Sequence, residues 1–315
     1  MTVLTVFQLN TQYSITHRVT LTHSAIVNKP EDKIHSVLLL PENPLRKAEG
    51  GLRTQGYFKL NQTDKPLISV ITVVFNGAEF LEQTIKSVIN QSYDNVEYII
   101  IDGGSTDGTI NIIKENEHKI DYWISEPDRG ISDAMNKGIN LSKGDYLIFL
   151  NSDDYFMSDG ALEKAVSFLK NKRHIYVFKV LFDDGEIKSV STNKAFNFLM
   201  NFKMGSCHQG HICSRSLFEK IGLFDSRFKI TMDYDFMLRA YRAGYTATPV
   251  DYILSVMRLV GISSRKDWKG LSDRFQEERK VHAKNTKCFW CPLLYWFYWP
   301  LYIQYRKIIY FLNSD

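Results

Sequence analysis

The chain has little cysteine and no long uninterrupted apolar run. Its four cysteines are too few for a disulfide scaffold in 315 residues, which favours a reducing compartment. No stretch reaches the ~20 apolar residues that a membrane-spanning helix needs. The nearest approach, residues 289–303, is interrupted by Pro292 and Pro300. The first residues lack the basic and apolar regions of a secretory signal. We therefore expect a cytoplasmic protein that does not span a membrane.

A strong net charge is also missing. The formal net charge of +4 gives no electrostatic basis for binding nucleic acid. The positive charge is concentrated at one end, because residues 265–315 hold ten Lys or Arg against five Asp or Glu. The same segment is rich in Trp and Tyr. We expect a poorly defined N-terminal extension and linker (1–65), a central domain (66–264) and a basic, aromatic C-terminal arm (265–315).

The central region alternates apolar strands with helical patterns. Its strands are expected at residues 68–75, 96–101, 122–124 and 146–150. Helices are expected to follow them, with apolar positions at helical spacing near residues 80, 110, 132 and 160. This alternation predicts βαβ units, and hence an α/β fold with a mostly parallel central sheet flanked by helices.

The flanking regions carry weaker patterns. Alternation predicts strands at 18–22 and 37–40 in the N-terminal extension. After residue 175 the pattern predicts a hairpin over 177–190. A helix is expected at 233–243, ended by Gly244, and a late strand at 252–258.

Acidic loops directly follow two of the central strands. Asp102 and Asp107 lie in the glycine-rich loop 102–108, and Asp153 and Asp154 follow the strand 146–150. Ligands of open α/β sheets bind at the carboxyl ends of the strands. Carboxylates gathered there repel one another unless a cation joins them. A divalent metal carrying a phosphate-rich ligand would explain them, and helix capping is the alternative.

Two more segments belong to the same pattern. The first strand ends at Phe75 and Asn76, and a loop containing Arg129 leads into a helix that carries Lys137. An arginine between an acid and a glycine suits a phosphate or a carboxylate. For Lys137, a solvated surface position is the alternative.

These four motifs, in this order, resemble the family 2 glycosyltransferases, bacterial enzymes with the GT-A fold, over residues 66–264. The resemblance implies a pocket for a nucleotide-sugar donor and a DxD-type site for Mg²⁺ or Mn²⁺ at Asp153 and Asp154. Asn151 stands where many relatives have Asp, so which carboxylate ligates the metal stays open. The implied donor-binding residues are Phe75, Asn76, Asp102, Gly104, Asp107, Arg129, Lys137 and Asp153.

The resemblance also implies a catalytic base at the start of the late helix. Met232 replaces the usual Glu there, Asp233 is the best match and Asp235 is the fallback. An inverting transfer needs one carboxylate near the acceptor hydroxyl. Capping of the helix is the alternative role for Asp233. The His208–Gln209 pair is implied on the acceptor side. A zinc site over 207–213 is disfavoured because its ligands are crowded into one segment.

The implied function is inverting, metal-dependent transfer of one sugar, expected from a UDP-linked donor, to a glycan or lipid-linked acceptor in bacterial surface polysaccharide biosynthesis. A sugar-nucleotide-forming nucleotidyltransferase and a catalytically silent glycan-binding subunit are the alternatives. Aromatic residues with the flanking cations Arg306 and Lys307 predict that the arm contacts the inner face of the cell membrane peripherally. An arm that covers the core or joins a second subunit is the other interpretation, and the oligomeric state stays open.

Overall fold

A computed structural model describes residues 5–21, 28–60, 62, 65–186, 188–260, 265, 267–286 and 291–312. At its centre lie four parallel strands in the order β7-β6-β5-β8. Their bounds are β5 Ile68–Val74, β6 Val96–Asp102, β7 Tyr122–Ser125 and β8 Tyr146–Phe149. Every residue of the four strands is buried, as expected for a sheet covered on both faces. The predicted α/β fold with parallel central strands is confirmed.

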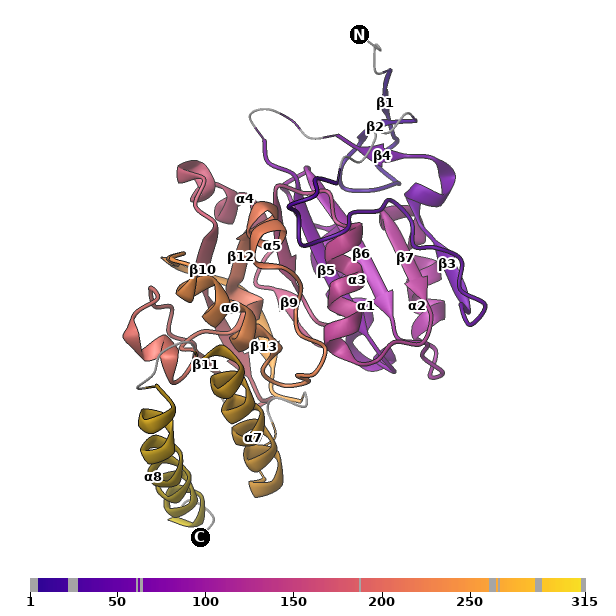
Figure 1. Cartoon of the computed structure of the whole chain (residues 1–315). Helices are drawn as coiled ribbons and strands as arrows, with labels where there is room; N and C mark the ends of the chain where they lie inside the picture. Colours follow the sequence, from indigo (N-terminus) through magenta and orange to yellow (C-terminus); the bar gives the residue numbers. More distant parts are fainter. Residues whose placement is uncertain are drawn as a thin grey trace.

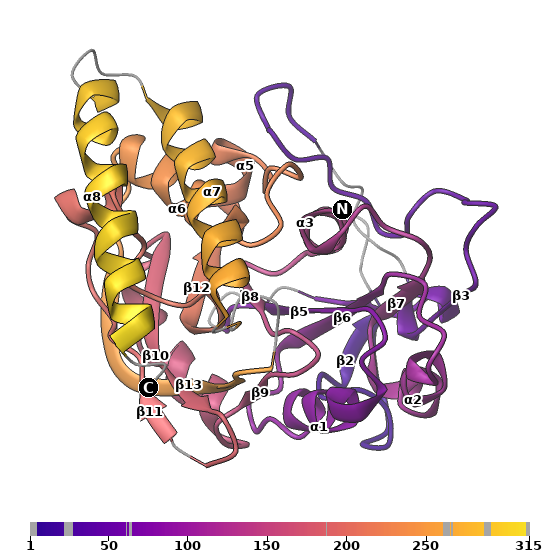
Figure 2. The same ribbon diagram turned by 90° about the horizontal axis from the view of Figure 1, so that it is seen from below.

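Helices cover both faces of this sheet (Figure 2). On one face lie α1 (Ala78–Ile89), α2 (Thr109–Glu115) and α4 (Ala161–Val166). On the other lie α3 (Ile131–Leu141), α5 (Arg215–Ile221) and α6 (Met232–Arg242). Alternate residues of β5 point to opposite faces, so that Val70 packs with the first group and Ile71 with the second. The two apolar cores are therefore a direct result of strand periodicity.

The sheet continues beyond the parallel centre with mixed strand directions, to ten strands. Past β8 come β12, β10, β13 and β9, with β11 paired to β10 as a hairpin. At the opposite edge, β3 pairs with β7. The bounds are β3 Ala48–Gly50, β9 Tyr155–Phe156, β10 Ile175–Asp183, β11 Lys188–Val190, β12 His211–Ser214 and β13 Thr248–Arg258. The hairpin, the late strand and the helix near 233–243 all match the sequence predictions.

The N-terminal segment forms a small sheet of its own and closes the amino ends of the central strands. The strands β1 (Val6–Gln8), β2 (Arg18–Thr20) and β4 (Phe58–Lys59) make a three-stranded sheet. Arg53, in the 3₁₀ turn Leu52–Gln55, forms an ion pair with Glu97, and Lys59 lies 3.5 Å from Asp121. These four side chains are at most 3% exposed.

One N-terminal prediction is wrong. Residues 37–40 form no strand. Their backbone N–H groups make isolated hydrogen bonds to the edge of the domain instead of a ladder with a neighbouring strand. The Val37 N–H donates to the Asn140 carbonyl, and the Leu40 N–H donates to the Tyr122 hydroxyl. Both side chains pack against the apolar core. Their apolar character therefore serves packing rather than strand pairing.

The C-terminal arm is a pair of helices lying side by side, α7 (Trp268–Asn285) and α8 (Cys291–Leu312) (Figures 1 and 2). Phe275, Tyr295 and Trp299 are buried between them. The two prolines interrupt the apolar run of the sequence but not the helix. Pro292 sits in the first turn, where no N–H bond is lost, and α8 continues through Pro300. Among the described residues, no helix is long and apolar enough to cross a membrane.

Candidate active site

A cavity of about 1100 Å³ opens at the carboxyl ends of β5 and β8. One wall comes from residues 73–75 and 151–154, at the ends of these two strands. A second wall comes from residues 207–209 and from residues 229–234, which lead into α6. The arm supplies a third wall through α7 and α8. This is the edge of the sheet at which the sequence predicts ligand binding.

The loops after β5 and β6 interlock beside the cavity. Asn76 adopts a left-handed conformation with φ of 51°. Its N–H donates to the Ser105 hydroxyl at 2.7 Å, and its side-chain oxygen accepts from the Thr106 N–H at 2.9 Å. Asp107 accepts the N–H of Ala78 at the start of α1. These bonds hold Phe75 at the cavity mouth, where 66% of the residue remains exposed.

Asp102 lies behind this surface rather than on it. Its carboxylate is fully buried and accepts bonds from the N–H groups of Gly104 and Ser105 and from the hydroxyls of Ser105 and Ser125. Gly104 has a φ of 87°, a conformation that residues with a side chain adopt with strain. The geometry therefore favours a role for Asp102 and Gly104 in shaping the loop.

The two basic residues of the third motif point away from the cavity. The Arg129 side chain is 81% exposed and pairs with Asp133 at 2.7 Å, four residues further along. Lys137 pairs with Glu126 at 2.7 Å, and Glu126 also pairs with Arg46 of the N-terminal segment. Neither Arg129 nor Lys137 lines the cavity. Asp128, which the sequence analysis left without a role, does line it.

Asp153 and Asp154 differ in how they are held. Asp154 is buried, with one oxygen accepting from the Gln209 amide at 2.9 Å and the other from the Arg258 N–H at 3.3 Å. Burial, and then the charge of Asp153, raise the pKa of Asp154 to about 7. Burial also raises the pKa of Asp153. Among the described side chains, none donates a hydrogen bond to the Asp153 carboxylate, which faces the cavity.

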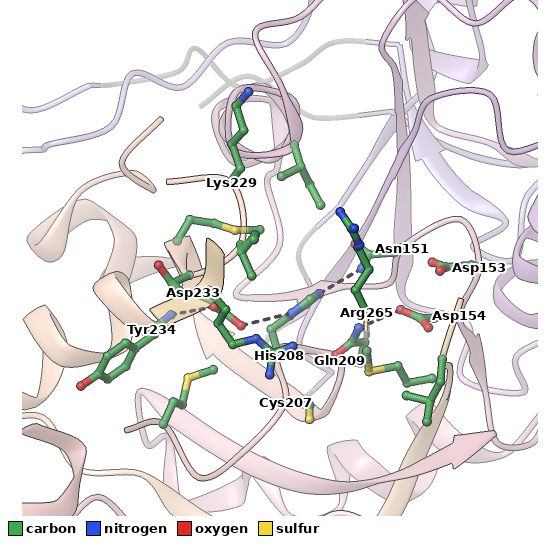
Figure 3. Close-up of a pocket in the computed structure, with 18 of the residues that line it drawn as sticks. Asn151, Asp153, Asp154, Cys207, His208, Gln209, Lys229, Asp233, Tyr234 and Arg265 are labelled. Atoms are coloured by element: carbon green, nitrogen blue, oxygen red, sulfur yellow. Dashed lines mark hydrogen bonds and ion pairs between the residues drawn. The ribbon is translucent and has the colours of Figure 1, made fainter. Parts of the chain in front are cut away.

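His208 links the two carboxylate-bearing walls (Figure 3). Its Nδ1 lies 3.4 Å from Oδ2 of Asp233, and its Nε2 lies 3.2 Å from the Asn151 amide nitrogen. Burial alone would lower the pKa of His208, but Asp233, Asp154 and Asp153 outweigh it and raise that pKa. Burial would raise the pKa of Asp233, but His208 outweighs it and lowers that pKa. Each of the two groups therefore favours the charged form of the other.

Asp233 and Asp235, which the sequence could not separate, have different surroundings. The Asp233 side chain is 16% exposed and lines the cavity. Asp235 is fully buried outside it and accepts bonds from Arg239 at 2.9 Å, Lys284 at 2.8 Å and Asn285 at 2.9 Å. Asp235 therefore ties α6 to α7, and only Asp233 is in a position to meet a ligand.

Sequence reasoning missed the contribution of the arm to the site. Arg274, Glu278 and Arg306 line the cavity, together with Lys203 from the loop before the His208 segment. Only the basic excess of residues 265–315 hinted at them. Within the described residues, no group of three or more His, Cys, Asp or Glu side chains is arranged to hold a metal ion.

Comparison with known proteins gives concordant matches. Residues 69–245 match the model of glycosyl transferase family 2. An uncharacterized glycosyltransferase of Mycobacterium tuberculosis is 38% identical over 186 residues, which are 56% of this chain and 70% of the relative. A PGL/p-HBAD biosynthesis glycosyltransferase of M. tuberculosis is 29% identical over 217 residues, covering 66% of this chain and 80% of the relative.

Solved structures show the same fold at low identity. Staphylococcus aureus TarS 1–349 in complex with UDP-GlcNAc has a TM-score of 0.55 and 18% identity, covering 70% of this chain and 68% of that one. The match spans 40% of a longer TarS chain. The mannosyltransferase PcManGT of Pyrobaculum calidifontis, in complex with GDP-Man and Mn²⁺, has a TM-score of 0.54 and 18% identity, covering 75% of this chain and 70% of that one.

Proposed function

Because the chain belongs to glycosyl transferase family 2, we propose that it moves one sugar from a nucleotide-sugar donor to a glycan or lipid-linked acceptor, with inversion at the transferred carbon. UDP is the expected nucleotide, and a UDP-sugar is the ligand of one structural neighbour. The observation that carries the proposal is the presence of Asp153 and Asp233 in one cavity, on either side of the His208–Asn151 contact (Figure 3).

We assign the donor to the wall formed by residues 73–75 and 151–154. The exposed ring of Phe75 offers an apolar face for a nucleotide base. Asp128, close to Gly103 in the same wall, offers a carboxylate to donor hydroxyls. Asn76 and Asp107 hold the loops that present these groups. The donor would therefore lie across the ends of β5 and β8.

A divalent cation, Mg²⁺ or Mn²⁺, fits the two adjacent carboxylates. Burial raises the pKa of both, and the charge of Asp153 adds to it for Asp154, so a hard cation with oxygen ligands would relieve that cost. Asp153 would hold the ion, since both Asp154 oxygens already accept bonds from Gln209 and Arg258. One carboxylate suffices where the phosphates of the donor supply further ligands. When bound, the ion supplies positive charge to the leaving diphosphate.

Asp233 is assigned as the general base. Its carboxylate is ionised at neutral pH because His208 lowers its pKa, so it can accept the proton of the acceptor hydroxyl. His208 orients one oxygen of Asp233, and the Tyr234 N–H donates to the other at 2.7 Å. On the acceptor side, Gln209 acts indirectly by holding Asp154. Attack from the Asp233 side, opposite the diphosphate, gives inversion.

Membrane contact is proposed through the outer face of α8. Six residues spaced three or four apart form one apolar stripe, each 51–73% exposed: Leu293, Phe297, Leu301, Tyr305, Ile308 and Leu312. Lys307 lies beside the stripe and can reach anionic lipid headgroups. This combination suits a helix lying in the interface of the cytoplasmic leaflet. The relative in PGL/p-HBAD biosynthesis supports a setting in surface polysaccharide assembly.

A thermal-shift screen tests the function directly. The full chain is heated with individual nucleotide sugars, with Mn²⁺ or with EDTA. A ligand at 100 times its Kd stabilises the native state by about 2.7 kcal/mol. We expect stabilisation by one nucleotide sugar only when Mn²⁺ is present, and its loss in Asp153→Asn. If every nucleotide sugar leaves the midpoint unchanged, or EDTA has no effect, the proposal is wrong.

A further inference from the structure

The wall that α7 and α8 give to the cavity, together with the adjoining Lys203, is called the arm wall here. It gathers positive charge around a single carboxylate. Lys203, Arg274 and Arg306 all line the cavity and all act electrostatically on Glu278. None of the three forms an ion pair with a carboxylate among the described residues, within the 4.0 Å limit that defines the other pairs. Three cations thus act on one acid, which lies on α7.

Two of the cations meet at one hydroxyl group. The Lys203 amine lies 3.4 Å from the Tyr302 hydroxyl oxygen, and the Arg306 guanidinium donates to the same oxygen at 3.0 Å. Two like charges that meet at a neutral hydroxyl repel each other unless an anion lies nearby. Arg274 makes no hydrogen bond to any described residue and extends the same wall. The wall therefore offers an anion several donors at once.

Glu278 is a second, independent indication that this wall binds a ligand. It is only 5% exposed, yet its Oε2 has no hydrogen-bond partner. A buried carboxylate oxygen without a partner is costly, and native proteins normally satisfy such groups. Glu278 lines the cavity although its Oε2 is itself buried, so a ligand hydroxyl would meet this oxygen after a turn of the side chain. The wall combines donors for an anion with one acceptor for a hydroxyl.

The wall is also partly apolar, and its two helices lie beyond the region that the family model matches. Leu271 and Ile309 line the cavity beside the cations. Ile309 directly follows Ile308, which lies in the exposed stripe of α8. The family model ends at residue 245, before α7 and α8 begin. The carboxylates assigned to the metal and to the general base lie on the other two walls. The arm wall is therefore left for the acceptor.

We propose that Lys203, Arg274 and Arg306 bind the phosphate or diphosphate group of an amphiphilic acceptor, with Leu271 and Ile309 contacting the start of its lipid. The proposal rests on the proposed function, because it assigns the acceptor of that reaction. Glu278 accepts a hydrogen bond from a hydroxyl of the sugar joined to the phosphate. The reacting hydroxyl then lies towards Asp233, and the lipid leaves the cavity along α8 towards the membrane surface.

The test measures binding of farnesyl diphosphate to the full chain, in EDTA and below the micelle concentration, with farnesol as the uncharged control. The variants are Arg274→Gln and Lys203→Gln. Arg279→Gln is the matched control, because Arg279 is exposed on the same helix and does not line the cavity. Each lost charge-assisted contact should weaken farnesyl diphosphate about tenfold. Farnesol binding and the Arg279→Gln variant should be unaffected.

A parallel titration with UDP and Mn²⁺ separates the acceptor from the donor. We expect UDP affinity to be the same in all three variants and in the unmodified chain. If UDP affinity falls together with that of farnesyl diphosphate, the cations serve the donor diphosphate and the proposal is overturned. Equal affinity of all variants for farnesyl diphosphate, or none in the unmodified chain, also overturns it. Failure of UDP to bind anywhere, with farnesyl diphosphate binding intact, would instead count against the proposed function alone.

Discussion

Replacing Asp233 and Asp235 separately by Asn should separate catalysis from stability within one turn of α6. Asp235 is fully buried and accepts bonds from Arg239, Lys284 and Asn285. Breaking a buried ion pair by removing one partner costs about 3–5 kcal/mol. The low end applies here, because Lys284 keeps an ion pair with Asp225 at 2.7 Å. We expect Asp235→Asn to lower the free energy of unfolding by about 3 kcal/mol.

The Asp233→Asn change should lower turnover and leave the free energy of unfolding nearly unchanged. Asp233 is partly exposed in the cavity and contacts His208 with a long 3.4 Å separation. Its change to Asn should alter the free energy of unfolding by about 1 kcal/mol or less. Without a general base, turnover should fall by about 10²-fold or more, with donor affinity retained.

Urea unfolding and the rate of nucleoside diphosphate release, measured on both variants, test this pair of expectations. Turnover of Asp235→Asn is to be measured well below its unfolding midpoint, so that only folded protein contributes. The reasoning is refuted if Asp235→Asn is stable but inactive while Asp233→Asn keeps its turnover. It is also refuted if both variants lose stability equally, because Asp233 would then act as a structural residue.

Three further expectations concern the metal site and the arm. Asp153→Asn should weaken Mn²⁺-dependent UDP binding about tenfold or more, measured by calorimetry, whereas the same change at the exposed Asp159 should not. Because the folded pKa of Asp154 is raised to about 7, ionisation of this one carboxyl group destabilises the metal-free fold. The contribution of Asp154 to the free energy of unfolding is therefore largest below the ordinary carboxyl pKa and is lost as the pH rises towards 7. Asp154→Asn should therefore raise the metal-free melting temperature at pH 8 but not at pH 4. Finally, Leu301→Glu on the α8 stripe should reduce co-sedimentation of the protein with vesicles of anionic phospholipid. The control Leu45→Glu, at a similarly exposed site away from the arm, should leave co-sedimentation unchanged. Equal effects of the two changes would refute contact through α8.

The sequence predicts the parallel core well because its signal is local. Each central strand is a mostly apolar segment with Gly, Asn or Asp close to one of its ends, and burial on both faces favours that pattern. The acidic loops follow from the same strands, since a strand end fixes where the next residues lie. The wrong strand at 37–40 shows the limit of this signal, because apolar side chains there pack against a core that other segments build.

The site depends on side-chain partners that are distant in sequence, and such partners could not be predicted from local sequence patterns. Asp235 is distinguished from Asp233 by Lys284, which lies 49 residues further along the chain. Lys137 looks like a ligand-binding residue until Glu126 is seen to pair with it. The cationic wall exists only because α7 and α8 pack beside Lys203. Composition revealed the basic excess of the arm, but not which of its charges face inwards.

The ion pairs beneath the central strands decide where this domain can be cut. Glu97 and Asp121 sit on or beside central strands, but their counterions Arg53 and Lys59 come from the segment before residue 69, where the family match begins. A fragment trimmed to the matched region would keep two carboxylates inside the protein and discard both cations. It would also lose the edge strand Ala48–Gly50 and leave β7 unpaired on that side. The folding unit is therefore longer than the region that the family model matches, and we expect the isolated match to be less stable than the full chain.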